Sequence, residues 1–297
     1  AIFVEGYGDD VTIARNVVHD VTPKPHRYAN GRAIQVRGYY ASRPLTGISV
    51  DNNEIARCAV QDGNVLEISG NTSHDHVNGN RLHDNTGIAL NVTGGTRPPI
   101  YKRWDLQVSD VVVGSNDVKR TLGAGAVGIY VQASRDVEVE HNRVSRSSWG
   151  IYVTSEYPGV HSRDVTISDN VVTDNVEAGI LVGSPFFPTT VIGATVDRNS
   201  VLHNGAFEGG NGGNFGIGRA RHVRVRNNQF VASDDHVLTY LGAPYKDILL
   251  DENCYDSHTH QAAKARFGYA GTQYVGFKPY QAATHQDRSS TFGPSCD

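Results

Sequence analysis

Two tyrosines occupy the same position in two copies of one short motif. Tyr130 and Tyr152 are each the third residue of a Gly-Ile-Tyr-Val tetrad, and these tetrads begin at Gly128 and Gly150. A phenol can give up or supply a proton in a transition state. A pair of phenols on neighbouring structural units could therefore act as the base and the acid of one reaction.

Basic side chains nearby could complete such a site. In β-elimination on a uronic-acid sugar, a base removes the proton next to the carboxyl group, and a cation or polar group neutralises the carboxylate. The candidate cations are Arg37, Lys102 and Arg103, with Gln132 as a neutral partner. We therefore favour a polysaccharide lyase as the first functional hypothesis.

Acidic side chains that interrupt the repeat offer a second chemistry. Glycoside hydrolysis needs two carboxyl groups on either side of the scissile bond. Glu67, Glu156 and Glu208 are available, together with Asp105. Glu156 is the best placed of these, because it lies shortly after the Tyr152 tetrad. A third hypothesis is a non-catalytic glycan-binding or surface adhesin module.

The elements that must position these groups form an internal repeat. A Gly-Ile-x-Val tetrad begins at Gly128, Gly150 and Gly179, and runs of the form Asp-Val-x-Val/Ile-x-x-Asn-x-Val lie between the tetrads. Alternating apolar and polar residues predict short strands. Such a unit cannot bury its own apolar face, so neighbouring units must stack into a solenoid.

One asparagine marks each unit of this repeat. The spacings are mostly 26 to 29 residues, and the residues are Asn16, Asn53, Asn80, Asn116, Asn142, Asn170, Asn199, Asn227 and Asn253. Asparagine tolerates the left-handed backbone conformation, so we expect Asn142 and Asn170 to adopt it at sharp bends. Acidic and histidine residues that recur after these asparagines, such as Asp20, Asp84 and His83, are interpreted as turn residues.

This rhythm of strand, asparagine, strand and Gly-Ile-x-Val resembles the right-handed parallel β-helix proteins of the pectate-lyase-like superfamily. The resemblance implies an all-β solenoid of about nine rungs over residues 1–255, with residues 256–297 as a C-terminal cap in a single overall domain. It also implies a secreted, carbohydrate-active protein, extracellular or periplasmic. Families of this superfamily often hold Ca²⁺ on clustered acids. Here Ala89, Tyr130, Tyr152 and Gly218 are expected at those positions, so we predict no cofactor and keep Ca²⁺ as the alternative.

Long insertions flank the tetrad strand and would wall a groove that suits a linear polysaccharide or oligosaccharide. They span residues 21–31, 38–47, 93–109, 155–163, 184–190 and 205–215. Alternation puts Tyr130 and Tyr152 on the groove floor, where aromatic faces suit sugar rings. Further substrate-binding candidates on the floor and walls are Gln35, Asn91, Arg103, Trp104, Gln132, Tyr157, His161, Phe186 and Phe207.

Composition excludes other kinds of partner. The 297 residues carry a formal charge of -4 with basic and acidic residues interspersed, which argues against nucleic acid. No apolar run is long enough to span a membrane. The segment from Ala1 to Val4 already matches a tetrad strand, so we expect a missing N-terminal cap or a partner domain at residue 1.

Three cysteines and two histidine-rich segments complete the inventory. Cys254 and Cys296 are expected to form a disulfide that fastens the cap, and Cys58 is expected to be a buried thiol. Residues 74–76 with 83–84, and Cys254 with two nearby histidines, have metal-ligand character. Because such residues belong to the repeated turns, we predict no metal site.

Overall fold

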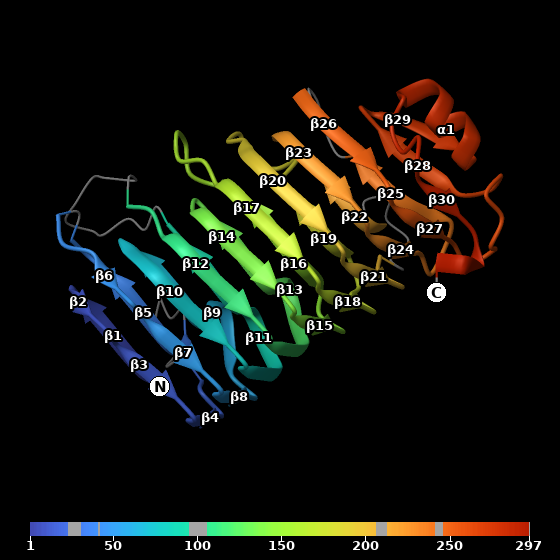
Figure 1. The fold of residues 1–297 in the computed structure, drawn as a ribbon. Helices are drawn as coiled ribbons and strands as arrows, with labels where there is room; N and C mark the ends of the chain where they lie inside the picture. The colour runs from blue at the N-terminus through green and yellow to red at the C-terminus, as the bar shows by residue number, and fades with distance from the viewer. Residues whose placement is uncertain (23–30, 41, 95–105, 206–212, 241–245, 297) are drawn as a thin grey trace.

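The chain folds into a parallel β-helix. The computed structural model describes residues 1–22, 31–40, 42–94, 106–205, 213–240 and 246–296. Each turn of the chain contributes strands to three long layers, and the turns stack from the N-terminal end to the C-terminal end (Figure 1). This confirms the predicted all-β solenoid.

The first layer, called here the first sheet, carries the tetrads. Its strands pair in parallel and are β1 (Ile2–Gly6), β5 (Arg32–Gly38), β9 (Ala59–Gly70), β11 (Arg81–Thr93), β13 (Asp117–Gln132), β16 (Trp149–Thr154), β19 (Ala178–Val182), β22 (Gly213–Ile217) and β25 (His236–Tyr240).

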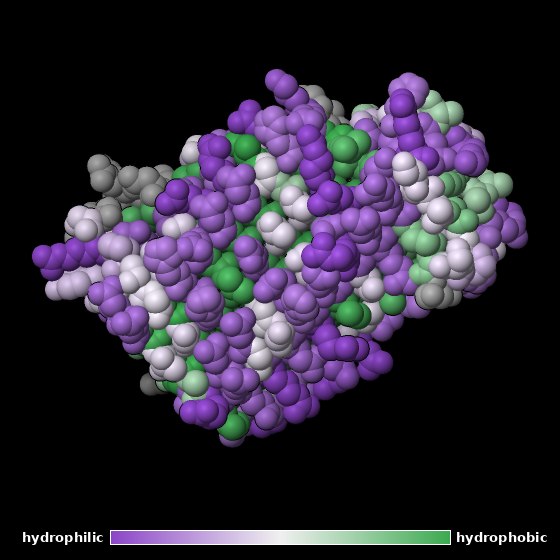
Figure 2. Space-filling view, viewed as in Figure 1, coloured by the Kyte–Doolittle hydropathy of each residue, from purple (hydrophilic) through white to green (hydrophobic). Residues whose placement is uncertain are grey.

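The second sheet follows the first in every turn. It contains β2 (Gly8–Asp9), β3 (Thr12–Ala14), β6 (Leu45–Thr46), β7 (Ser49–Asp51), β10 (Thr72–Asn78), β12 (Ser109–Gly114), β14 (Arg135–Glu140), β17 (Arg163–Ser168), β20 (Val191–Asp197), β23 (Ala220–Arg226) and β26 (Lys246–Asp251). Its outer face is largely hydrophilic (Figure 2). No helix among the described residues is long and apolar enough to cross a membrane.

The third layer is made of short strands and of the first residues of β11 and β13. The short strands are β4 (Val17–His19), β8 (Glu54–Ala56), β15 (Arg143–Ser145), β18 (Val171–Thr173), β21 (Ser200–Leu202), β24 (Gln229–Val231) and β27 (Cys254–Asp256). Inward valine, isoleucine and leucine side chains from all three layers form one continuous core. Shared burial between turns supplies the stability that a single turn lacks.

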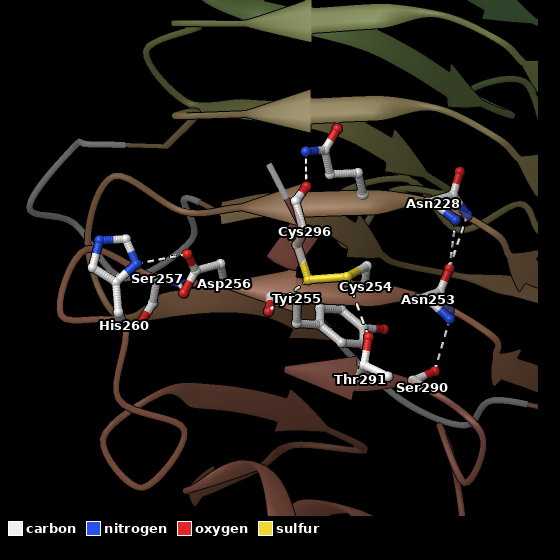
Figure 3. Close-up of a disulfide and its surroundings, with 11 residues drawn as sticks. Asn228, Asn253, Cys254, Tyr255, Asp256, Ser257, His260, Ser290, Thr291 and Cys296 are labelled. Carbon is white, nitrogen blue, oxygen red and sulfur yellow. Dashed lines mark hydrogen bonds and ion pairs between the residues drawn. A yellow bond between two sulfur atoms is a disulfide. The ribbon is translucent and has the colours of Figure 1, made fainter. Parts of the chain in front are cut away.

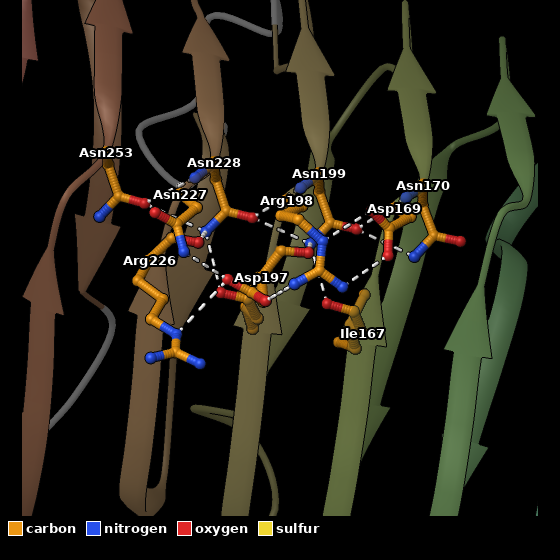
Figure 4. Close-up of polar contacts among 11 residues, drawn as sticks. Ile167, Asp169, Asn170, Asp197, Arg198, Asn199, Arg226, Asn227, Asn228 and Asn253 are labelled. Atoms are coloured by element: carbon orange, nitrogen blue, oxygen red, sulfur yellow. Dashed lines mark hydrogen bonds and ion pairs between the residues drawn. The ribbon is translucent and has the colours of Figure 1, made fainter.

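A ladder of buried asparagines joins the turns. In each turn the asparagine accepts hydrogen bonds from the backbone and side-chain amides of its predecessor, as Asn170 does from Asn142 at 2.9 and 3.0 Å. The ladder runs through Asn16, Asn53, Asn80, Asn116, Asn142, Asn170, Asn199, Asn228 and Asn253. Figure 4 shows its part from Asn170 to Asn253.

Two details of the predicted ladder are wrong. Asn228 is the ladder member, and its neighbour Asn227 lies exposed with φ 55°. The left-handed residue is the one before each ladder asparagine, as His141 and Asp169 show, both with φ 56°. The ladder asparagine itself must point inward to bond its neighbours, and the preceding residue therefore makes the sharp bend.

The C-terminal segment packs on the last turns. An antiparallel pair, β28 (Arg266–Tyr269) and β29 (Thr272–Val275), precedes α1 (Phe277–Thr284), β30 (Thr291–Phe292) and a 3-10 turn over Pro294–Cys296. Tyr280 stacks on Phe267 with ring centroids 4.6 Å apart. The ladder ends here, because the hydroxyl of Ser290 accepts the backbone N–H of Asn253 at 2.8 Å.

The cysteines behave as the sequence predicts. Cys254 and Cys296 form a disulfide between β27 and the C-terminal end (Figure 3). Cys58 is a buried free thiol, and burial raises its pKa. The disulfide removes Cys254 from any metal-ligand set. Among the described residues there is no group of three histidine, cysteine or acidic side chains that could hold a metal.

The recurring acids and histidines lie at turns. Asp20, Asp84 and Asp174 all have φ near 57°, and Arg57 and Arg120 take the same conformation in neighbouring turns. A bidentate contact with Arg57 and a bond from His19 lower the pKa of Asp20 to about 2. These three aspartates lie at left-handed bends, and Asp20 and Asp84 pair with Arg57 and Arg120 of the next turn, which confirms their interpretation as turn residues.

Candidate active site on the first sheet

The outer face of the first sheet aligns one side chain from each turn. Strand register places Phe3, Gln35, Glu67, Asn91, Tyr130, Tyr152 and Leu181 in one row across the strands. The expected places of two residues are wrong. Ala89 packs in the core, and Gly216 instead of Gly218 pairs with Leu181.

The two tyrosines form a small apolar cluster outside the main core. Their ring centroids lie 5.4 Å apart in an edge-to-face arrangement, and Trp149 stacks on Tyr152 at 5.7 Å. Leu181 and Val127 complete the cluster. Tyr130 is only 5% exposed and Tyr152 only 8% exposed. The expected open aromatic floor for sugar rings is therefore wrong at these two residues, because their rings cover each other and the sheet.

Glu156 lies directly above this cluster. It follows β16 and accepts a hydrogen bond from the hydroxyl of Tyr130. Burial raises the pKa of Glu156, although the bond from Tyr130 acts in the opposite direction. Burial and the adjacent carboxyl group raise the pKa of Tyr130 well above its usual value. Burial thus favours the protonated form of Glu156 over what an exposed glutamate would show.

Glu67, on β9 three turns earlier in the chain, has the opposite environment. Burial alone would raise its pKa, but the charge of Arg32 and several donors outweigh that effect and lower it. Arg32 Nε donates to one oxygen at 2.5 Å, as does Asn64 Nδ2 at 2.6 Å, and Gln35 Nε2 donates to the other oxygen at 2.9 Å. Glu67 is therefore an ionised carboxylate with a fixed orientation.

Tyr157 is near enough to both carboxyl groups for their charges to affect its pKa. Burial raises its pKa, hydrogen bonding with Gln132 and the charge of Arg37 lower it, and the charges of Glu156 and Glu67 raise it. Both carboxyl groups thus act electrostatically on the same hydroxyl. The segment that follows β16 places Glu156 and Tyr157 side by side, so the insertion folds back over the row of first-sheet side chains.

Arg37 occupies the second outward row of the first sheet, beside Glu5 on β1. Its guanidinium lies over the ring of Tyr39, 4.7 Å from the centroid, and bonds the Tyr39 hydroxyl at 3.4 Å. It has no carboxylate partner within ion-pair distance among the residues described. Its charge is consequently available to an anionic ligand.

The remaining candidates divide into three groups. Asn91 is buried in the row beside Glu67 and Tyr130, with no partner for Oδ1. His161 bonds the carbonyl of Thr190 at 2.7 Å, and Phe186 is 69% exposed on the next insertion. The other candidates lie outside the described residues: Lys102, Arg103, Trp104 and Phe207, together with Asp105 and Glu208.

Arg32 and Asn64 were not among the residues predicted from the sequence. Arg32 on β5 and Asn64 on β9 are cross-strand neighbours one turn apart, and the side chain of each donates a hydrogen bond to Glu67. The signal that could have found them is the register itself. Once Gln35 is aligned with Glu67, the residues three positions earlier must also be neighbours.

The fold and this row of side chains define a parallel β-helix whose first sheet carries two carboxyl groups beside an aromatic cluster. The family described as the right handed beta helix region matches residues 1–230, so the chain belongs to that family. The uncharacterized protein YwoF of Bacillus subtilis (strain 168) is 22% identical over 253 residues, which are 82% of this chain and 53% of that protein. The chain thus spans about half the length of this curated relative.

Solved structures show the same architecture. The tailspike protein of E. coli bacteriophage HK620, in complex with a pentasaccharide, superposes with a TM-score of 0.50 and 13% identity, over 82% of this chain and 49% of that chain. A single-residue mutant of the same tailspike gives a TM-score of 0.51 and 14% identity, over 86% and 54%. At these identities the likeness shows the fold alone.

Proposed function

We propose that the protein is a carbohydrate-active enzyme that hydrolyses a glycosidic bond of a linear polysaccharide lying along the first sheet. The observation that carries this proposal is the opposed environment of two carboxyl groups on one face. Burial keeps Glu156 protonated to higher pH, while Arg32 and its neighbours keep Glu67 ionised. Such a divided pair suits an acid and a base or charge stabiliser.

In the proposed reaction Glu156 gives its proton to the leaving oxygen as the glycosidic bond breaks, while a water molecule adds to the anomeric carbon and gives its proton to Glu67. Tyr130 orients the carboxyl group and Tyr152 supports the ring of Tyr130. Glu67 provides the second carboxylate, with Tyr157 and Gln132 next to the bound sugar. The HK620 tailspike, which has this fold, was solved with a pentasaccharide, and that supports a glycan as the ligand.

Polysaccharide lyase chemistry is the alternative. It would use Tyr130 or Tyr152 as the base and Arg37 as the clamp. The pKa of both phenols is raised, mainly by burial, so neither is readily deprotonated at neutral pH. Arg37, by contrast, suits a uronate carboxylate. The balance favours hydrolysis over β-elimination.

The deciding test is a panel of acidic and neutral polysaccharides, with two readouts on each. Reducing ends that appear without the ultraviolet absorbance of an unsaturated uronate support hydrolysis, and absorbance that rises with reducing ends supports the lyase.

Glu156→Gln should lower the hydrolytic rate about 100-fold or more, and the matched change Glu138→Gln, on the exposed face of the second sheet, should not. The proposed chemistry uses carboxyl groups, so a chelator should leave the rate unchanged. Product formation by Glu156→Gln at the wild-type rate would refute the proposal, and silence on both readouts would favour the binding-module hypothesis.

We expect the protein to act outside the cytoplasm. The disulfide between Cys254 and Cys296 is typical of oxidising compartments. A polysaccharide substrate would also be met there. A secreted or periplasmic location is therefore part of this proposal, and fractionation of the producing cells tests it.

A further inference from the structure

A group of tyrosines and arginines lies at the N-terminal end of the first sheet, away from Glu156. Tyr7 follows β1, and Tyr39 and Tyr40 follow β5. The rings of Tyr7 and Tyr40 meet edge to face with centroids 5.4 Å apart. Tyr7 is 55% exposed and Tyr40 is 44% exposed, so this pair is open to solvent in a way that Tyr130 and Tyr152 are not.

Two arginines are stacked on these tyrosines. Arg43 lies over the ring of Tyr7 with its guanidinium carbon 4.9 Å from the centroid, and Arg37 lies over Tyr39 at 4.7 Å. A guanidinium that stacks by its face leaves its N–H donors pointing outward in the plane. The stack also restricts the side chain before a ligand arrives, which lowers the entropy lost on binding.

The charges of the two arginines are not neutralised by ion pairs. In the part of the chain that the structure describes, neither Arg37 nor Arg43 has a carboxylate within 4.0 Å. The nearest acid in this group, Glu5, accepts the hydroxyl of Tyr39 at 3.2 Å. The Nε of Arg37 is buried without a hydrogen-bond partner. Arg43 is exposed and Arg37 is partly exposed, so each guanidinium has N–H groups that an anionic ligand can reach.

The group is continuous with the candidate active site. Register carries the row of Arg37 through Ser69 and Thr93 to Gln132, which is three strand spacings or about 14 Å. The charge of Arg37 also lowers the pKa of Tyr157. One extended ligand could therefore contact both places.

We propose that Tyr7, Tyr39, Tyr40, Arg37 and Arg43 form a binding site for a carboxylate-bearing sugar of a glycan whose other units lie at Glu156. The exposed surface of the Tyr7 and Tyr40 pair contacts the ring, and the arginines bind the carboxylate with charge-assisted hydrogen bonds. This inference rests on the proposed function, because it assigns the acidic glycans as the substrate class. It places their recognition several sugar units from the reacting bond.

Isothermal titration of the full chain carrying Glu156→Gln, which should slow turnover during the measurement, tests this site. The probes are hexamers of galacturonate, mannuronate and guluronate, each beside its methyl ester, which has the same ring without the charge. At least one free acid should bind about tenfold more tightly than its ester. Adding Arg43→Gln or Tyr7→Ala should remove that difference, whereas Arg143→Gln, an exposed arginine on β15, should keep it. Equal affinity for acid and ester, including no binding by either, overturns the inference.

The two proposals can fail separately. If Arg43→Gln leaves both the affinity and the KM for an acidic glycan unchanged while Glu156→Gln abolishes turnover, the sugar site is wrong and the hydrolase stands. If Glu156→Gln turns over at the wild-type rate while Arg43→Gln loses affinity, the binding site stands and the catalytic assignment is wrong.

Discussion

Tyr130 donates its phenol hydrogen to Oε1 of Glu156, which lies 26 residues later in the chain and one turn further along the helix. The bond crosses from the ordered first sheet to an insertion, so it ties the conformation of that insertion to the scaffold. It also stabilises the ionised form of a carboxyl group whose burial favours the neutral form.

The pH dependence of catalysis should therefore respond to Tyr130. A general acid acts in its protonated form, so the rate should fall as pH rises through the pKa of Glu156. Tyr130→Phe removes a donor that lowers this pKa, and the alkaline limb of the kcat profile should shift to higher pH. Tyr274→Phe, in the cap, should leave the limb in place. A shift towards lower pH would contradict the assignment of Glu156 as the acid.

Glu67→Gln should destabilise the fold, because it leaves the half-buried Arg32 without its carboxylate. Loss of one member of a buried pair costs about 3 kcal/mol. The pKa of Glu67 is lowered in the folded state, so this stabilisation is present above the unfolded pKa and disappears as pH falls through the folded pKa. Denaturant unfolding at neutral and acid pH measures the difference. The double variant Glu67→Gln with Arg32→Met should recover part of the loss at neutral pH, and an equal loss at both pH values would contradict the ion-pair account.

Two adjacent asparagines should differ sharply in their effect on stability. Asn228→Ala removes bonds to Val196, Arg226 and Asn253 within the ladder and leaves buried groups unpaired, at about 1 to 3 kcal/mol for each group. Asn227→Gly keeps the left-handed bend and should change the free energy of unfolding by less than about 1 kcal/mol. Thermal unfolding of both variants checks this, and similar effects would mean that the ladder is not a main source of stability.

Ionisation of the buried Asp75 carboxyl group should lower the free energy of unfolding as pH rises. It is fully buried in β10, and burial raises its pKa to about 6, although the backbone N–H of Ile48 donates to Oδ1 at 3.1 Å. Because the folded pKa is above the unfolded value of 3.8, the destabilisation develops as pH rises from 3.8 to about 6. Asp75→Asn should be the more stable protein above that range, by about 2 to 3 kcal/mol.

The control for Asp75 is the exposed Asp110, which pairs with His74. Asp110→Asn should not reproduce the gain at neutral pH, because no desolvation is relieved there. Denaturant midpoints measured across the acid range provide the comparison. If the two variants show the same pH dependence, burial of Asp75 is not its cause.

Loss of the disulfide should loosen the cap. Cys254 and Cys296 are 42 residues apart, and a crosslink over that distance stabilises by up to about 4 kcal/mol through the unfolded chain. The double change to serine should lower the unfolding temperature and increase hydrogen exchange in β28 to β30 first. Cys58→Ser is a separate control for the removal of a thiol. Uniform exchange throughout the chain would argue against a local role in the cap.

The sequence was sufficient for the architecture because its repeat is periodic at two levels. Alternation specifies each strand, and the recurring asparagine specifies each turn. The predicted ladder was wrong at Asn227 because the adjacent Asn228 has the same side chain. The two residues differ only in that the side chain of Asn228 points inward. The wrong placement of Ala89 also comes from a small displacement along the chain. The strand register changes between Thr86 and Ile88, so the residues that follow are offset from the predicted alternation.

The site was predictable only where the repeat extends into it. Alternation placed Tyr130, Tyr152, Gln35 and Glu67 on the outer face. It could not show that the tyrosine rings cover one another, or that Arg32 reaches Glu67, because those outcomes depend on side-chain conformation. The contact between Tyr130 and Glu156 depends on how an insertion folds, and no periodicity describes an insertion.

The asparagine ladder makes the turn an interchangeable unit of length. Asn142, Asn170 and Asn199 make the same bonds at intervals of 28 and 29 residues, so a duplicated or deleted segment of that size would meet matching partners on both sides. Gene duplication could thus lengthen the first sheet in steps of one strand spacing, about 4.8 Å. The distance between the arginines near β1 and Glu156 would change by whole steps, and with it the length of glycan that spans them.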